Sequence, residues 1–249
     1  MLIPVSIVIV TKNEEANIEA ALDSVKDAAE IVVIDSFSSD RTVEICRKYT
    51  DKVSRKEWEG YARQKQAAVD LAACQWVFIL DADERVTPEL KAEVINAIEE
   101  NRYDGFYVPR KNFFMGQCIR HGGWRPDYTL RLFKKKAGRV EDREVHEKVI
   151  VNGSVSYLKT PLVHYTYNSV SDYLKRMDVY STLAAKELTK NGVVPNFMDF
   201  LLRPLAAFIK MFFLRFGFMD GRYGLALAVL YSYYTFLKYA KTWELKEKR

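Results

Sequence analysis

The sequence has few cysteines and no glycine-rich phosphate loop. Cys46, Cys74 and Cys118 lie far apart, in neither a metal-ligand spacing nor an even disulfide set. We therefore expect reduced thiols and a cytoplasmic compartment. Neither G-x-G-x-x-G nor G-x-x-x-x-G-K-S/T occurs, which disfavours dinucleotide oxidoreductases and P-loop enzymes. Any nucleotide must be held in another way.

Long charge-free apolar runs are also missing. Residues 1–10 are apolar but lack a basic leader and a small-residue cleavage site, so we expect a first strand and not a signal peptide. Arg203, Lys210 and Arg215 interrupt residues 200–218, and residues 223–237 are uncharged over only 15 positions. A transmembrane helix needs roughly 20 apolar residues, so neither segment is expected to span a membrane.

The composition is that of a folded protein whose two parts have different surroundings. The chain has 249 residues, 49% hydrophobic and 29% charged, which suits one large α/β unit with an appendage. Residues 197–249 contain nine Lys and Arg against four Asp and Glu, and 14 of the 33 aromatic residues. The whole net charge of +5 therefore lies there, and we expect a boundary near residue 196.

Strand and helix signals alternate over the first hundred residues. Apolar, β-branched runs at 6–10, 31–34 and 76–80 predict buried parallel strands, with a short strand near Val53. Asn13 and Asp40 are expected to cap helices, a further helix is expected at about 61–73, and Thr87-Pro88-Glu89 begins another. This order predicts a mostly parallel, doubly wound α/β sheet.

Three polar clusters follow these strands. Residues 11–14, 35–40 and 81–84 each begin where a predicted strand ends, and ligands of such sheets bind at the carboxyl ends of the strands. Asp81 and Asp83 would direct oxygen ligands at one spot, which suits a divalent cation partly held by phosphates. Simple capping of the strand ends is the alternative, and for Asp40 it is at least as good.

Taken together, the clusters resemble the family 2 glycosyltransferases of the GT-A fold, nucleotide-sugar enzymes with a D-x-D motif after a mid-sheet strand. The matching segments are residues 6–14, 33–35, 39–42, 62–65 and 78–84. Residues 122–124, 130–133, 145–147 and His164 resemble the branch that adds glucose to the inner core of lipopolysaccharide. Gln66 departs from that branch, where asparagine is expected. The resemblance implies a catalytic domain at 1–196, with a nucleotide-sugar half at about 1–100 and an acceptor half at about 101–196.

The resemblance also implies roles by position. The nucleotide-sugar contacts would be Thr11, Asn13, Glu14, Asp35 and Lys65. Asp81 would hold ribose or metal, Asp83 would ligate Mn2+ or Mg2+, and His164 would be a further ligand or a packing residue. Gly123 and Trp124 would contact the acceptor, with a core tryptophan under a loop as the alternative for Trp124.

The resemblance further implies inverting transfer by direct displacement, which requires a base that deprotonates the acceptor hydroxyl. Asp142 is the first candidate and Glu147 the second, with a solvated charge run as the alternative for either. His146 is expected to orient these acids. Arg131 could add a bidentate contact to the diphosphate, or could be a solvated arginine on an edge strand.

A helix is expected at 170–188, and the basic, aromatic region 197–249 is expected to lie in the interface of an anionic membrane. A helical hairpin buried against the catalytic domain or another subunit is the alternative.

Our hypothesis is a metal-dependent, peripheral enzyme at the cytoplasmic face of the inner membrane. It would transfer a hexose, glucose from UDP-glucose, to an inner-core heptose or a similar lipid-linked saccharide, without a nucleic-acid partner. The alternatives are transfer to polyprenyl phosphate and a non-catalytic membrane scaffold. A nucleotidyltransferase is disfavoured because its basic, glycine-rich loop is missing.

Overall fold

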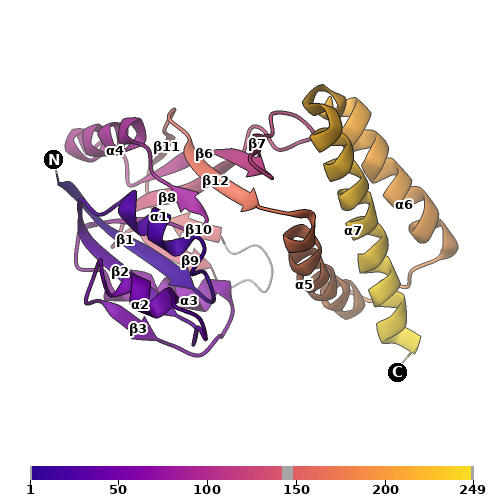
Figure 1. Ribbon diagram of the computed structural model, residues 1–249, viewed down its shortest axis with the longest axis horizontal. Coiled ribbons are helices and arrows are strands. Elements are labelled where there is room, and N and C mark those ends of the chain that lie inside the picture. Colours follow the sequence, from indigo (N-terminus) through magenta and orange to yellow (C-terminus); the bar gives the residue numbers. More distant parts are fainter. Residues whose placement is uncertain (1, 142–147, 248–249) are drawn as a thin grey trace. The chain divides into compact units, whose positions relative to one another are not determined.

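Four parallel strands from the first 80 residues form one half of a mixed sheet (Figure 1). The computed structural model describes residues 2–141 and 148–247. The order of the four parallel strands in the sheet is β3 (Val53–Arg55), β2 (Ala28–Asp35), β1 (Ile3–Thr11) and β4 (Trp76–Ile79). The predicted strand and helix order is confirmed here, and so is the α/β fold class.

The other half of the sheet is largely antiparallel, which the first hundred residues could not indicate. The order continues through β8 (Tyr128–Lys134), β6 (Gly105–Phe114), β12 (Leu162–Tyr167) and β5 (Glu84–Arg85). β8 is antiparallel to β4 and to β6. The remaining strands are β7 (Gln117–Cys118) and β11 (Val155–Tyr157), which pair with β6, and a separate pair, β9 (Gly138–Glu141) and β10 (Lys148–Val151). The sheet is therefore mixed as a whole.

Helices cover both faces of the parallel strands, which explains their unbroken apolar sequences. On one face, α1 (Ile18–Asp23), α2 (Thr42–Cys46) and α4 (Pro88–Glu100) share a core cluster with β1, β2 and β4. On the other face, α3 (Tyr61–Leu71) packs through Ala62, Ala68 and Val69 against Val8 and Ile79.

Two of the predicted helix starts are wrong and one is confirmed. α1 begins after Asn17, and Asn13 instead has a left-handed backbone with φ 54° in the preceding loop. The cap position of α2 is Arg41, and Asp40 accepts from the backbone N–H of Thr42. Thr87 caps α4 as expected, with Pro88 as the first helical residue. Asn13 and Asp40 instead lie in two polar loops that are hydrogen-bonded to each other.

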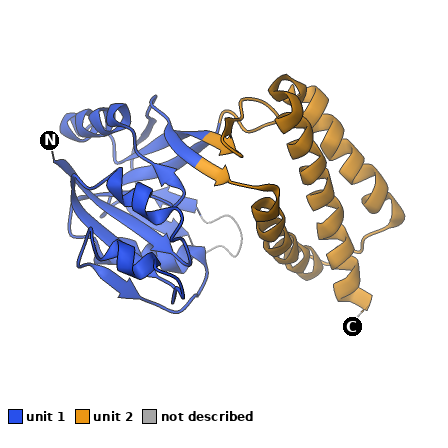
Figure 2. Ribbon diagram, in the orientation of Figure 1, with its two compact units in different colours: residues 1–111, 127–164 blue, residues 112–126, 165–249 orange. Residues whose placement is uncertain are grey.

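The chain divides into two compact units (Figure 2). The first contains residues 1–111 and 127–164, and the second contains residues 112–126 and 165–249. The second unit holds α5 (Val170–Lys190), α6 (Phe197–Ile209) and α7 (Gly221–Glu247), with a π-helical turn η1 (Lys210–Leu214) and a 3₁₀ turn η2 (Gly217–Asp220) before α7.

α5 groups with the C-terminal helices, which differs from the boundary expected near residue 196. α7 packs against both α5 and α6, and Tyr173 and Met177 of α5 share a core cluster with Leu227. Shared burial of apolar side chains is the physical reason for this grouping. Within the described ranges, none of the helices combines the length and apolar content needed to cross a bilayer.

Candidate active site

The three polar clusters begin at one edge of the sheet, as predicted. Thr11 at the end of β1 is paired with Asp35 at the end of β2, and the N–H of Ser36 donates to the carbonyl of Thr11. β4 lies on the other side of β1, with the N–H of Leu80 donating to the carbonyl of Val8. Asp81 therefore follows at the same edge.

The first two clusters bind each other closely. The N–H of Asn13 donates to Ser38 Oγ at 2.8 Å, and Asn13 Oδ1 accepts from the N–H of Ser39 at 2.8 Å. The N–H of Glu14 donates to Thr42 Oγ1 at 2.8 Å. Asp35 is fully buried and accepts from the Ser38 N–H at 2.9 Å. These contacts make the two loops one preorganised wall.

Two hydroxyl groups in this wall lack a partner among the described residues. Thr11 Oγ1 and Ser36 Oγ are both buried, and an unsatisfied buried hydroxyl costs roughly 1–3 kcal/mol. Such groups mark positions where a polar ligand would restore hydrogen bonds. Ser36 was not a predicted site residue, although its place after Asp35 at a strand end is the signal that identifies it.

Asp81 holds two cationic side chains, one with each carboxylate oxygen. Lys65 Nζ on α3 lies 2.9 Å from Asp81 Oδ1, and Arg131 Nη2 on β8 lies 2.6 Å from Oδ2. Arg131 is 3% exposed and its strand is paired on both sides, so it is not a solvated edge residue. Three residues that are far apart in sequence thus form one charged cluster.

Arg131 also binds Glu84, and the pKa values of Asp81 and Glu84 shift in opposite directions. Burial raises the pKa of Asp81, but the charges of Arg131 and Lys65 outweigh it and hold that pKa well below its ordinary value of 3.8. Burial also raises the pKa of Glu84, and there Arg131 does not outweigh it, so the net shift is upward. Burial lowers the pKa of Arg131, but the negative charges of Asp81 and Glu84 outweigh it and raise that pKa, so Arg131 stays a cation. Asp81 is therefore the firmly ionised member.

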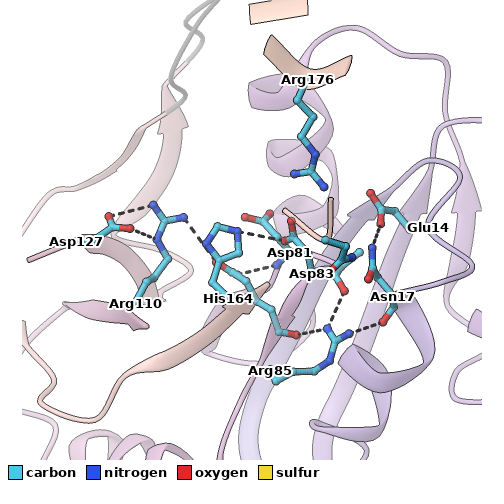
Figure 3. Close-up of polar contacts among 12 residues, drawn as sticks. Glu14, Asn17, Asp81, Asp83, Arg85, Arg110, Asp127, His164 and Arg176 are labelled. Carbon is cyan, nitrogen blue, oxygen red and sulfur yellow. Dashed lines mark hydrogen bonds and ion pairs between the residues drawn. The ribbon is translucent and has the colours of Figure 1, made fainter. Parts of the chain in front are cut away.

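Asp83 and His164 form a second, nearly buried pair (Figure 3). His164 Nε2 lies 3.6 Å from Asp83 Oδ1. The pairing of β12 with β5 sets this approach, because it places His164 opposite Glu84. The two side chains bring one carboxylate oxygen and one imidazole nitrogen together, both of which are ligands for divalent metals.

This donor set fits a divalent cation only as part of its coordination. Within residues 2–141 and 148–247, no group of three His, Cys, Asp or Glu side chains has the geometry of a metal site. Asp83 and His164 would supply two ligands, while both oxygens of Asp81 are engaged by cations. Further ligands would have to come from a bound molecule, as in sites where substrate phosphates complete the shell.

Glu84, Arg110 and Asp127 lie beside these side chains but were not among the residues given a role from the sequence. Arg110 on β6 makes a bidentate ion pair with Asp127, at 2.9 and 3.0 Å (Figure 3). Arg110 Nη1 also lies 3.8 Å from Glu84 Oε1. Glu84 directly follows the D-x-D motif, which is its sequence signal. Arg110 and Asp127 have none, because antiparallel pairing of β6 and β8 brings them together.

The predicted acceptor residues lie in the second unit. Gly122 and Gly123 have φ of +68° and +89°, a region open to glycine, and a Cβ on Gly123 would lie 2.2 Å from Arg215 Nη1. Trp124 is half-buried beside Tyr167, with ring centroids 6.3 Å apart. The predicted base candidates Asp142 and Glu147, and His146, lie outside the described residues.

Comparison with known proteins gives consistent matches along the chain. A family model described as glycosyl transferase family 2 matches residues 6–156. The lipopolysaccharide core biosynthesis glycosyltransferase LpsC of Rhizobium meliloti (strain 1021) is 30% identical over 252 residues, covering 97% of this chain and 93% of that protein. The uncharacterized glycosyltransferase RT0209 of Rickettsia typhi is 30% identical over 259 residues, covering 98% and 88%.

Solved structures with a similar fold cover the whole chain. S. aureus TarS 1–349 in complex with UDP-GlcNAc has a TM-score of 0.51 at 15% identity and is covered over 92% of its chain. The mannosyltransferase PcManGT from Pyrobaculum calidifontis, in complex with GDP-Man and Mn2+, has a TM-score of 0.51 at 15% identity and is covered over 89%. At these identities the likeness concerns the fold.

Proposed function

The chain belongs to glycosyl transferase family 2, and from that membership we propose that it is a metal-dependent, inverting hexosyltransferase. The donor is a uridine-diphosphate sugar with glucose as the hexose, and the acceptor is an inner-core heptose of lipopolysaccharide or a similar lipid-linked saccharide. The name of the relative LpsC, which states lipopolysaccharide core biosynthesis, supports the acceptor class. The TarS complex with UDP-GlcNAc supports the donor class.

The cationic pair on Asp81 carries this proposal. When a sugar leaves its nucleoside diphosphate, negative charge develops on the diphosphate, and fixed cations stabilise that charge without reorganising. Lys65 and Arg131 are 7% and 3% exposed and are already oriented by Asp81. Arg131 Nε also lacks a partner among the described residues, so a donor remains for an anionic ligand.

We assign the cation, Mn2+ or Mg2+, to Asp83 and His164. The 3.6 Å approach of a carboxylate oxygen to an imidazole nitrogen supports the assignment. A bound divalent ion would offset charge on the departing diphosphate without a proton transfer. In this assignment Asp81 orients Lys65 and Arg131 and does not itself ligate the metal.

We assign donor recognition to the wall formed by the first two clusters. Thr11, Asn13, Glu14 and Asp35 all belong to this hydrogen-bonded network or lie at its edge. The unsatisfied hydroxyl groups of Thr11 and Ser36 would be satisfied by the nucleoside.

We assign the acceptor to Gly123 and Trp124 and its deprotonation to Asp142, with Glu147 as the second candidate and His146 orienting the acids.

The proposed place of action is the cytoplasmic face of the inner membrane. The excess of nine basic over four acidic residues in 197–249 supports attraction to an anionic surface.

Thermal unfolding with nucleotide tests the proposal. Uridine diphosphate plus Mn2+ should raise Tm, because a ligand at 100 times its Kd stabilises the folded state by about 2.7 kcal/mol. Guanosine diphosphate plus Mn2+ is the matched control and should give a smaller shift. A non-catalytic scaffold would show no shift with either nucleotide.

A nucleotide-sugar screen then tests the reaction. UDP-glucose should be hydrolysed in preference to GDP-mannose, and excess chelator should stop the turnover. Transfer to polyprenyl phosphate in place of a heptose-containing lipid-linked saccharide would replace the acceptor in the proposal while leaving the donor site standing.

A further inference from the structure

The turns between α6 and α7 expose an unusual number of large apolar side chains. Residues 210–220, which we name the tip, expose Phe213, Leu214, Phe216, Phe218 and Met219 at 48–70% of their surface. α6 exposes a stripe that leads into the tip: Met198, Leu201, Leu202, Leu205 and Ile209. Their spacing places them on one side of the helix, and contiguous exposed apolar surface of this kind marks an interaction site.

The tip is held in a fixed shape that presents these side chains. Phe216 has φ 56°, a left-handed conformation that bulky residues rarely adopt. Gly217 and Gly224 pack so closely that a Cβ on Gly224 would lie 1.8 Å from the Gly217 carbonyl oxygen. Met211 is buried beneath them in the core of the second unit. The exposed aromatic side chains therefore project from a packed support.

The charges around the tip are almost all positive. Lys210, Arg215 and Arg222 are exposed there, and Arg120 and Arg125 are exposed on the loop 116–126 of the same unit. The one acid in these two segments is Asp220, whose side chain is 7% exposed and accepts hydrogen bonds from the protein. Apolar side chains ringed by cations fit an anionic lipid surface. A symmetric contact between two copies would instead bring like charges together.

The tip also holds the loop that carries Trp124. The N–H of Gly122 donates to the carbonyl of Arg215 at 2.8 Å. Asp220 accepts from the N–H of His121 at 2.8 Å and of Arg120 at 3.1 Å. Its other oxygen lies 3.2 Å from His121 Nδ1. Hydrogen bonds thus join the loop to the tip, although the two segments lie about a hundred positions apart in the sequence.

We propose that the tip inserts into the interface of an anionic lipid surface and that, through Asp220 and Arg215, it fixes the Trp124 loop at that surface. Lipid binding and the presentation of the predicted acceptor loop are then properties of one piece of structure. This inference rests on the proposed function only for the role of Trp124. The Trp124 loop would then contact a lipid-linked acceptor at the lipid surface in which that acceptor is anchored.

Vesicle sedimentation of the full-length chain tests the insertion. The probe is vesicles of equal parts phosphatidylglycerol and phosphatidylcholine, with no nucleotide present. Leu214→Glu, at a position 70% exposed, should weaken binding by about tenfold or more, because the burial of one leucine is lost and a repelled charge is added. Val179→Glu is the matched control: Val179 is 56% exposed on α5, and its substitution should leave binding unchanged. Both variants should keep the wild-type Tm.

Hydrogen exchange tests the link between tip and loop. Vesicles should slow exchange of the amides of residues 120–122 in the wild type and in Val179→Glu, but not in Leu214→Glu. Without vesicles, Asp220→Ala should speed the exchange of the Arg120 and His121 amides, and Asp220→Asn should restore it, because the amide oxygen still accepts.

Three results would overturn the inference. The first is equal vesicle binding by Leu214→Glu and the wild type. The second is protection of the tip without protection of residues 120–122. The third is a stable dimer in solution that Leu214→Glu dissociates, since the tip would then serve a second copy. The vesicle and exchange experiments contain neither donor nor acceptor. If the wild type binds vesicles as expected but shows no glycosyl transfer in a separate assay, only the proposed function is contradicted.

Discussion

At the scale of single residues, Asp81 is the acid on which the cationic side chains of the site depend. Replacing it with asparagine would leave the buried Arg131 and Lys65 with one partner fewer. We predict that Asp81→Asn lowers the free energy of unfolding by about 3 kcal/mol at neutral pH, since removing one partner of a buried pair leaves an uncompensated charge. Urea unfolding measures this difference.

The pH dependence of this effect has a definite sign. The pKa of Asp81 is lower in the folded state than its ordinary value of 3.8. Its stabilising contribution is therefore fully present above pH 3.8 and is lost as the pH falls through the folded-state pKa. The gap between variant and wild type should narrow in that acidic range. Asp51→Asn, at an exposed position, is the control and should change stability by less than about 0.5 kcal/mol.

Asp83 should matter for chemistry more than for folding. We predict that Asp83→Ala lowers transfer by about two to three orders of magnitude or more, because a ligand that offsets charge on the leaving diphosphate is removed. Circular dichroism should show an unchanged fold. Asp104→Asn is the control. Asp104 pairs with Lys134 and is not one of the site residues, so its substitution should leave transfer unchanged. Wild-type turnover in excess chelator would refute the metal assignment.

The choice between the two base candidates also belongs to single residues. We predict that Asp142→Asn lowers kcat by about two to four orders of magnitude while uridine diphosphate still binds, because the acceptor proton alone is affected. Single-turnover kinetics and nucleotide titration measure the two effects. If Glu147→Gln gives this pattern and Asp142→Asn does not, Glu147 is the base.

At the scale of elements, the start of α7 gives a prediction whose sign depends on tertiary packing. Alanine is a better helix former than glycine by about 1 kcal/mol, so helix propensity alone predicts that Gly224→Ala is stabilising. A Cβ there would lie 1.8 Å from the Gly217 carbonyl oxygen. We therefore predict a loss of about 1–3 kcal/mol in the free energy of unfolding. An increase in stability would show that η2 and α7 do not approach this closely.

At the scale of the whole molecule, the two units make one truncation informative. A fragment of residues 1–196 would keep α5 but lose α7, which shares a core cluster with Tyr173 and Met177. We predict that this fragment exposes apolar surface and aggregates. Size-exclusion chromatography and binding of a hydrophobic dye measure this. A monodisperse fragment with wild-type dye binding would mean that α5 does not need α7.

The sequence by itself determined the parallel half of the sheet and the edge at which its three polar clusters begin. Its strands are continuous apolar runs because helices cover both of their faces. The polar clusters that follow β1, β2 and β4 begin at one edge because these strands are parallel neighbours. Thr87 and Pro88 defined the start of α4 because their preferences are local. The family followed from the order of such motifs.

Tertiary structure alone decided which charges meet. Lys65, Asp81 and Arg131 come from a helix, a loop and a strand, and neither composition nor periodicity states that β8 lies beside β4. The same holds for Arg110 with Asp127 and for Asp220 with the Trp124 loop. Long-range pairing depends on the packing of whole elements, whereas caps and strand runs depend on neighbours in the chain. Helix caps and strand runs can therefore be predicted from the sequence, whereas the partner of each charged side chain is determined by the fold.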